Sequence, residues 1–195
     1  MSEERTLEYV VQVVLGVSLI TVLGFITATI YGALQRRLIV ATELERKIEE
    51  GRAFSSSKRF TLAAGGSVRI LFNNRSGRNV KVVAVEINTQ GNINVDIYDN
   101  VTVESSGSKW IIRNLNLASN NTIDVDVEDG GTYSGGELVH QTIGYGGAKN
   151  FAVGSLSEVG ERVIVPGGRN IMLEVTNITS QDFDISVRFI FYEAD

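Results

Sequence analysis

The stretch from Tyr9 to Gln35 constrains this chain most, because it holds 27 consecutive residues without a charged side chain. Its polar residues are mainly Ser and Thr, whose hydroxyl groups can hydrogen-bond to a helix backbone. An apolar run of this length fits a helix that crosses the hydrocarbon core of a bilayer, which needs about 20 residues. A core helix of a soluble domain is the alternative, although such helices are usually shorter. The sequence therefore predicts a single-pass transmembrane helix.

The residues before this stretch differ from a signal peptide. Met1 to Glu8 carry three Glu against one Arg, whereas a signal peptide begins with net positive charge. We therefore expect the helix to be retained as a membrane anchor.

Small residues recur along one face of the predicted helix, at Gly16, Gly24, Ala28 and Gly32. Positions four apart lie on nearly the same face of a helix. Small residues there allow a second helix to approach closely within a bilayer. We predict a helix-packing groove; the alternative is the ordinary abundance of Gly in membrane helices.

The helix is expected to continue to about Glu50 as an amphipathic stalk. Apolar residues keep the helical spacing at Leu38, Ala41, Leu44 and Ile48. Gly51 stands where a left-handed residue would end the helix. The apolar stripe predicts a seam between copies in a homo-oligomer, and packing back on the following domain is the alternative.

After the stalk the apolar residues change from helical to alternating spacing. About ten short strands are separated by turns rich in Gly, Asn and Ser, which is typical of an antiparallel sandwich or barrel. We predict a transmembrane helix and stalk over 1–50, a linker over 51–58 and a β domain over 59–195. The last strand, Phe183 to Tyr192, is apolar on one face and is expected at the centre of a sheet.

The sequence offers little for catalysis. His140 is the only His, and no Gly-x-Ser-x-Gly motif occurs. The glycine-rich segment 144–147 lacks the Lys-Ser/Thr ending of a phosphate-binding loop. We therefore expect no enzymatic activity and no cofactor.

Metal and nucleic-acid binding are weakly indicated. Without Cys, thiolate sites are excluded, and the remaining metal candidates are Asp124, Asp126 and Glu128, which alternate along a predicted strand. A solvated outer face is the favoured interpretation of these carboxylates. The net charge of −5 gives no basic footprint for a nucleic acid.

Four Asn-x-Ser/Thr sequons lie near predicted turns, and in a secreted context they could carry glycans at Asn74, Asn100, Asn120 and Asn177. The alternative is that a chain rich in Asn, Ser and Thr forms sequons by chance.

The charges beside the apolar stretch conflict with an exterior β domain. Four basic residues follow it, at 36, 37, 46 and 47, and one precedes it, which places the β domain on the cytoplasmic side. A virus that assembles in the cytoplasm around an internal membrane would reconcile this charge pattern with an exterior β domain, because its particle displays the cytoplasmic face of the membrane outward.

Three segments of the β domain resemble jelly-roll domains of viral fibres and phage spikes: Phe60 to Asn74, Gly130 to His140 and Val165 to Asn177. The resemblance implies a jelly-roll-like antiparallel sandwich in an oligomeric virion surface protein. It also implies contacts with other coat proteins or with a host receptor or glycan. With the predicted anchor, the lipid membrane and further copies of the chain become expected partners.

Two other functions fit the same outline. A long N-terminal helix followed by a β domain also resembles type IV pilins, subunits of a cell-surface filament. A cellular membrane-anchored carbohydrate-binding module is the other alternative, with sugars stacking on Tyr98, Trp110, Tyr133 and Tyr145.

Overall fold

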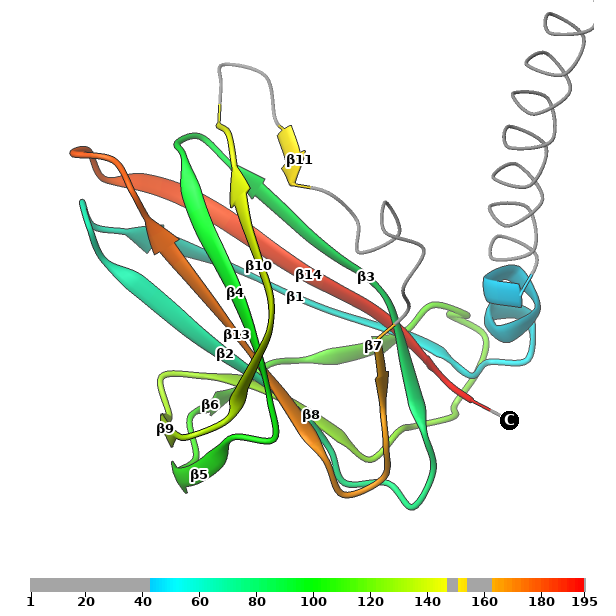
Figure 1. The fold of residues 1–195 in the computed structure, drawn as a ribbon. Helices are drawn as coiled ribbons and strands as arrows, with labels where there is room; N and C mark the ends of the chain where they lie inside the picture. The colour runs from blue at the N-terminus through cyan, green and yellow to red at the C-terminus, as the bar shows by residue number, and fades with distance from the viewer. Residues whose placement is uncertain (1–42, 147–150, 154–162, 195) are drawn as a thin grey trace, which may run out of the picture. The chain divides into compact units, whose positions relative to one another are not determined.

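The computed structural model describes residues 43–146, 151–153 and 163–194. The chain divides into two compact units, Met1–Glu43 and Leu44–Asp195, and apart from Glu43 the described residues all belong to the second. That second unit is a β sandwich of two six-stranded antiparallel sheets with an additional two-stranded sheet (Figure 1).

The strands are distributed over the three sheets as follows. The first sheet has the order β11 (Phe151–Val153), β3 (Val80–Thr89), β14 (Phe183–Glu193), β1 (Ala53–Leu62) and β7 (Ile112–Asn114), and β12 (Val163–Val165) also pairs with β3. The second sheet has the order β10 (Glu137–Gly144), β4 (Ile93–Asp99), β13 (Asn170–Asn177), β2 (Ser67–Asn74), β8 (Val125–Asp129) and β6 (Ser108–Lys109). The small sheet pairs β5 (Thr102–Ser105) with β9 (Thr132–Ser134).

The first four strands of the chain, β1 to β4, alternate between the two large sheets. β14 returns to lie between β1 and β3, and β13 returns to lie between β2 and β4. This is the winding of a jelly roll, a double-sheet fold built from two Greek keys. The central position predicted for the last strand is confirmed, since β14 pairs on both sides.

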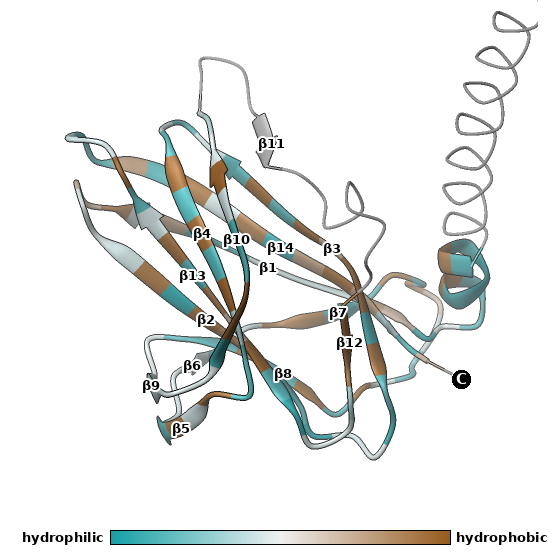
Figure 2. Cartoon of the chain, in the orientation of Figure 1, coloured by the Kyte–Doolittle hydropathy of each residue, from teal (hydrophilic) through white to brown (hydrophobic). Residues whose placement is uncertain are grey.

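The main core fills the space between the two large sheets. β14 contributes every second residue to it, and the side chains between them face the other way. Phe72 of β2 packs against Phe189 and Phe191 of β14, with ring centroids 5.7 and 5.0 Å apart. Figure 2 shows the same alternation as bands of apolar and polar residues along the strands. Burial of these aromatic rings supplies much of the free energy that stabilises the sandwich.

A second apolar cluster lies on the outer face of the second sheet. Leu71, Met172 and Tyr98 are cross-strand neighbours on β2, β13 and β4. Val101 and Tyr133, from the β5 and β9 region, pack over them. The two-stranded sheet therefore covers apolar surface that the second sheet would otherwise expose.

The expected long N-terminal helix is corrected by the structure. In the part of the chain that the structure describes, the helical segment covers 43–49, and no helix is long and apolar enough to cross a membrane. The described residues therefore form a mainly β sandwich with one short helix, and the expectation of a single-pass membrane protein is not supported. The apolar stretch from Tyr9 to Gln35 lies outside the described residues.

The helical segment ends as predicted at Gly51, which has a φ of 67°. The Gly51 amide donates to the carbonyl of Ile48 and the Arg52 amide to that of Lys47, the two hydrogen bonds of a Schellman motif. Leu44 and Ile48 pack against Ala53, Val83 and Tyr192 on the outer face of the first sheet. The last turn of the helix is therefore part of the sandwich unit, because its apolar side chains find partners there.

The segment 51–58, predicted as a linker, contains the first half of β1. Its alternation is obscured because a serine, Ser56, occupies a core-facing position between Phe54 and the residues that follow. The Ser56 hydroxyl is satisfied by donating to the carbonyl of Ile111 at 3.1 Å. The β domain therefore begins at Ala53, and the sandwich unit begins at Leu44 rather than after residue 50.

Candidate functional site

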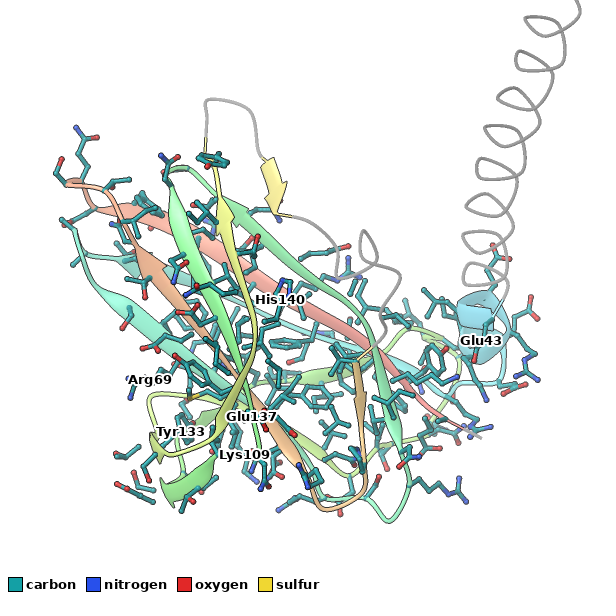
Figure 3. The ribbon with its side chains drawn as sticks, in the orientation of Figure 1. Glu43, Arg69, Lys109, Tyr133, Glu137 and His140 are labelled. Atoms are coloured by element: carbon teal, nitrogen blue, oxygen red, sulfur yellow. The ribbon has the colours of Figure 1, made fainter. Side chains whose placement is uncertain are left out.

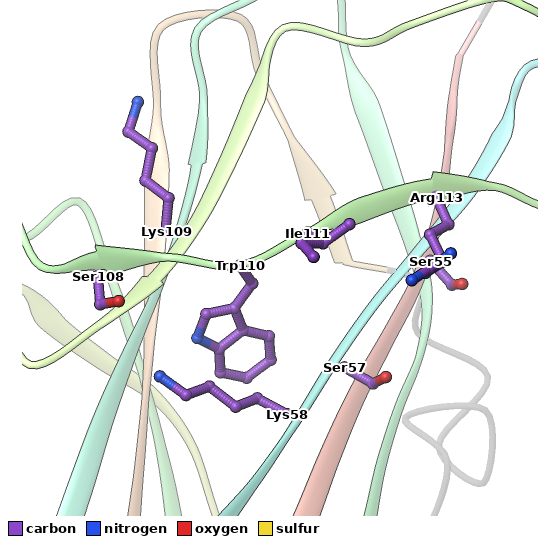
Figure 4. Close-up of a pocket in the computed structure, with 8 residues that line it drawn as sticks. All are labelled: Ser55, Ser57, Lys58, Ser108, Lys109, Trp110, Ile111 and Arg113. Atoms are coloured by element: carbon purple, nitrogen blue, oxygen red, sulfur yellow. The ribbon is translucent and has the colours of Figure 1, made fainter.

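A pocket of about 460 Å³ lies where the chain crosses from one large sheet to the other (Figure 4). β6 pairs with β8 of the second sheet, and β7 pairs with β1 of the first. Trp110 and Ile111 connect β6 with β7 and span the edge of the sandwich. The pocket is lined by Ser55, Ser57, Lys58, Ser108, Lys109, Trp110, Ile111 and Arg113.

Trp110 forms a fixed wall of this pocket. Its side chain is only 8% exposed and packs against Phe60 and Phe189, with ring centroids 5.7 and 6.1 Å away. Its Nε1 donates to Oδ1 of Asp129 at 2.5 Å, and Nζ of Lys58 donates to the same oxygen at 2.5 Å. One carboxylate thus holds both the indole and the lysine in place.

A row of polar residues runs from the pocket along the outer face of the first sheet. Ser55, Ser57 and Arg59 are alternate residues of β1 and so project from one face. Arg113 of β7 pairs directly with Ser55 and projects from that same face. We call Arg113, Ser55, Ser57 and Arg59 the arginine–serine row.

The cations at the site differ in how they are compensated. Lys58 pairs with Asp129 at 2.5 Å, and Lys109 pairs with Asp126 at 2.8 Å. Arg59 and Arg113 are exposed and form neither an ion pair nor a hydrogen bond with any described residue. The row thus presents two uncompensated guanidinium groups with serine hydroxyls between them. Guanidinium and hydroxyl donors together suit carboxylate, sulfate or phosphate groups.

His140 lies on β10, opposite Ile97 of β4, and is half-buried (Figure 3). Within the described residues it forms no hydrogen bond or ion pair with a nucleophile or an orienting acid. The geometry therefore gives this side chain no catalytic partner among the residues that the structure describes.

The three carboxylates that were considered as metal ligands interact with other side chains of the protein. Asp124 and Asp126 both pair with Arg75, at 3.0 and 3.1 Å. Glu128 is buried and accepts a 3.4 Å hydrogen bond from the Tyr133 hydroxyl. Among the described residues, no group of three His, Asp or Glu side chains could hold a metal ion.

The same contact changes the acidity of Tyr133. Burial of the phenol and the nearby Glu128 carboxylate raise the pKa of Tyr133 to about 12. Tyr133 and Tyr98 belong to the outer cluster of the second sheet, and Trp110 belongs to the core. Of the four aromatic residues considered for sugar stacking, Tyr145 is the one that is largely exposed.

The four sequons separate into two structural classes. Asn74 and Asn177 are 0% and 1% exposed, whereas Asn100 and Asn120 are exposed. Each buried Asn accepts hydrogen bonds from the amide and hydroxyl of the Ser or Thr two residues later, and its own amide donates to backbone carbonyls. These two sequons therefore order the turns after β2 and β13.

The predicted helix-packing residues and half of the predicted seam, namely Gly16, Gly24, Ala28, Gly32, Leu38 and Ala41, lie outside the described residues. The other two seam residues, Leu44 and Ile48, contact the chain's own sandwich. Their role between copies of the chain stays a prediction.

Sequence reasoning missed the arginine–serine row. Three of its four residues, Ser55, Ser57 and Arg59, lie in or next to the segment interpreted as a linker. The available signal was their alternation with Phe54 and Phe60, which marks one face of a strand as polar. The pairing of Arg113 with Ser55 joins residues 58 positions apart, and no local pattern indicates it.

No family model matches the chain, and no curated protein matches it. Among solved structures, the crystal structure of the Yersinia pseudotuberculosis-derived mitogen is similar, with a TM-score of 0.36 and 9% sequence identity. The match covers 69% of this chain and 83% of the mitogen chain. A TM-score this low supports no conclusion about fold or function.

Proposed function

We propose that the chain is a non-catalytic structural protein of a surface assembly, in the first instance a virion surface, and that it presents its sandwich for attachment to a host. The observation that carries this proposal is the way in which the helical segment joins the sandwich. A displayed module needs a defined orientation at the end of the segment that carries it.

The last helical turn is held on the sandwich by polar as well as apolar contacts. The side-chain amides of Asn116 and Asn114 donate to the carbonyls of Glu49 and Gly51, at 3.1 and 2.8 Å. The carbonyls at the end of a helix have no partners within it, so these amides satisfy groups that otherwise need water. Together with the packing of Leu44 and Ile48, they prevent residues 44–52 from acting as a flexible tether.

The jelly-roll winding adds an analogy at the level of the fold, since viral coat and lectin domains use it. The pocket at the edge of the sandwich adds a place for contact with a ligand, and its residues suit binding rather than catalysis.

The test is antibody labelling of intact particles purified from the organism that makes the protein. Antibodies against the folded sandwich should decorate the particle surface in electron micrographs without prior disruption. Labelling that appears only after the particles are opened would refute display. Labelling of filaments on cells would indicate that the surface assembly is a pilin-like filament and not a virion.

A further inference from the structure

We propose that the arginine–serine row and the adjoining pocket bind an acidic polysaccharide, with Arg59 and Arg113 as the charge-recognising residues. This inference deepens the attachment part of the proposed function and rests on it.

Arg59 and Arg113 are exceptional among the described basic residues. The other described Arg and Lys side chains form ion pairs, or in the case of Lys81 a contact with the Tyr192 ring. Both uncompensated arginines are on the same face of the same sheet, one on each side of Ser55 and Ser57. Among the described cations, the two that form no contact with a described partner therefore lie at one place.

Two described carboxylates lie on the neighbouring strands of this face. Glu86 pairs with Arg188 at 3.4 Å, whereas Asp184, opposite Thr61 beyond the end of the row, keeps its negative charge and accepts a 2.7 Å hydrogen bond from the Thr61 hydroxyl. Arg188 lies directly opposite Ser57, so it adds a third guanidinium beside the row. No carboxylate lies between Arg113 and Arg59 along β1, where the intervening outward residues are serines. An anion that approaches the row along β1 therefore meets hydrogen-bond donors, namely guanidinium and hydroxyl groups.

The spacing of the two arginines favours an extended ligand. Ser55, which pairs with Arg113, is four residues from Arg59, a distance of about 13 Å along a strand. A single small anion cannot lie close to both backbone positions, whereas a chain that carries several anionic groups can occupy both. Each guanidinium can bind a carboxylate or a sulfate through two parallel hydrogen bonds.

The remaining lining suits a sugar. The hydroxyls of Ser55, Ser57 and Ser108 can donate to and accept from sugar hydroxyls. The Ile111 side chain is 71% exposed and offers an apolar surface to the C–H face of a sugar ring. A nucleic acid fits less well, because the chain carries a net charge of −5 and nucleic-acid sites usually show a broad basic footprint.

The experiment measures binding of the full chain to three immobilised polysaccharides by surface plasmon resonance. Heparin carries sulfate and carboxylate groups, hyaluronan carries carboxylates only, and dextran is neutral. We expect binding to heparin that weakens with salt, and no binding to dextran. Binding to hyaluronan as well would identify the carboxylate as sufficient, and its absence would identify the sulfate as the recognised group.

The variant R59A/R113A should bind about tenfold more weakly or worse, because each arginine contributes charge-assisted hydrogen bonds. The matched control R75A/R169A removes two positive charges from other exposed sites and should bind like the unmodified chain. The variant R59K/R113K keeps the charge but loses the planar fork, so an intermediate affinity is expected. Thermal unfolding of R59A/R113A should be unchanged, because neither arginine forms an ion pair or a hydrogen bond with a residue that the structure describes.

Three outcomes would overturn the inference: absence of binding to both acidic polysaccharides, equal binding by R59A/R113A, or equal affinity for single-stranded DNA or acidic lipid vesicles. A sandwich that is displayed on particles but binds no acidic polysaccharide would refute this inference alone. A sandwich that binds heparin but is hidden inside particles would refute the proposed display.

Discussion

Trp110 Nε1 donates a 2.5 Å hydrogen bond to Asp129 Oδ1, which fixes the indole against the end of β8. The Trp110 amide also donates to the carbonyl of Val127 in β8, so Trp110 is held on the second sheet. The same oxygen accepts from Lys58 of β1. The carboxylate therefore links both sheets to the wall of the pocket.

Replacing Asp129 by Ala should destabilise the sandwich by about 1–3 kcal/mol, because it leaves the indole N–H and the lysine without their acceptor. Urea unfolding measures the change. Trp110 is the only Trp in the chain, so its fluorescence reports this site specifically, and its emission should shift to longer wavelength. Asp124→Ala is the control: that exposed carboxylate pairs with Arg75, and its loss should cost about 1 kcal/mol or less. Equal losses in the two variants would contradict the structural role of Asp129.

Gly51→Ala should destabilise the sandwich more than Gly65→Ala. Both glycines have positive φ, 67° and 68°, so each substitution carries a backbone cost of about 1–2 kcal/mol. A Cβ on Gly51 would also lie 2.2 Å from Oγ of Ser119, whereas a Cβ on Gly65 meets nothing within 4 Å. The difference between the two unfolding free energies therefore measures the close contact of the helix end with the 114–121 loop. If the two variants lose the same stability, Ser119 does not hold the helix end.

Glycosylation in a eukaryotic secretory host should separate the four sequons. Folded, secreted protein should carry glycans at Asn100 or Asn120, and none at Asn74 or Asn177. A glycan on either buried Asn would remove its amide from the turn that it orders. Mass spectrometry of glycopeptides measures the occupancy of each site. High occupancy of Asn74 in protein that unfolds cooperatively would contradict the role of its side-chain amide in ordering the turn.

Stability should fall at alkaline pH partly through Tyr133. The pKa of this phenol is raised from 10.0 to about 12 in the folded chain, so folding favours its protonated form. That contribution is fully present below pH 10 and is lost as the pH rises toward 12. Tyr133→Phe should therefore show a shallower decline of the unfolding free energy between pH 10 and 12. An identical decline in both proteins would mean that Tyr133 titrates as it does when unfolded.

Local patterns account for much of the sandwich. The alternation of Ile185, Val187, Phe189 and Phe191 predicts both a strand and its central place, because only a strand with neighbours on each side buries so apolar a face. Gly51 predicts the end of the helix for a similarly local reason, the freedom of glycine to adopt positive φ. The first half of β1 was missed because a serine, Ser56, takes a core position there and interrupts the apolar alternation.

The candidate site was decided by the tertiary structure. The sequence alone determined a β domain rich in short strands, an alternating polar face and the absence of Cys, since these follow from residue types and their spacing over a few positions. Three relationships came from contacts between distant segments: the pairing of Arg113 with Ser55, the sharing of Asp129 by Trp110 and Lys58, and the packing of Leu44 and Ile48 on the sandwich. Whether a cation is neutralised or left free depends on which carboxylate the fold brings within a few ångströms of it, and spacing along the chain carries no information about that distance.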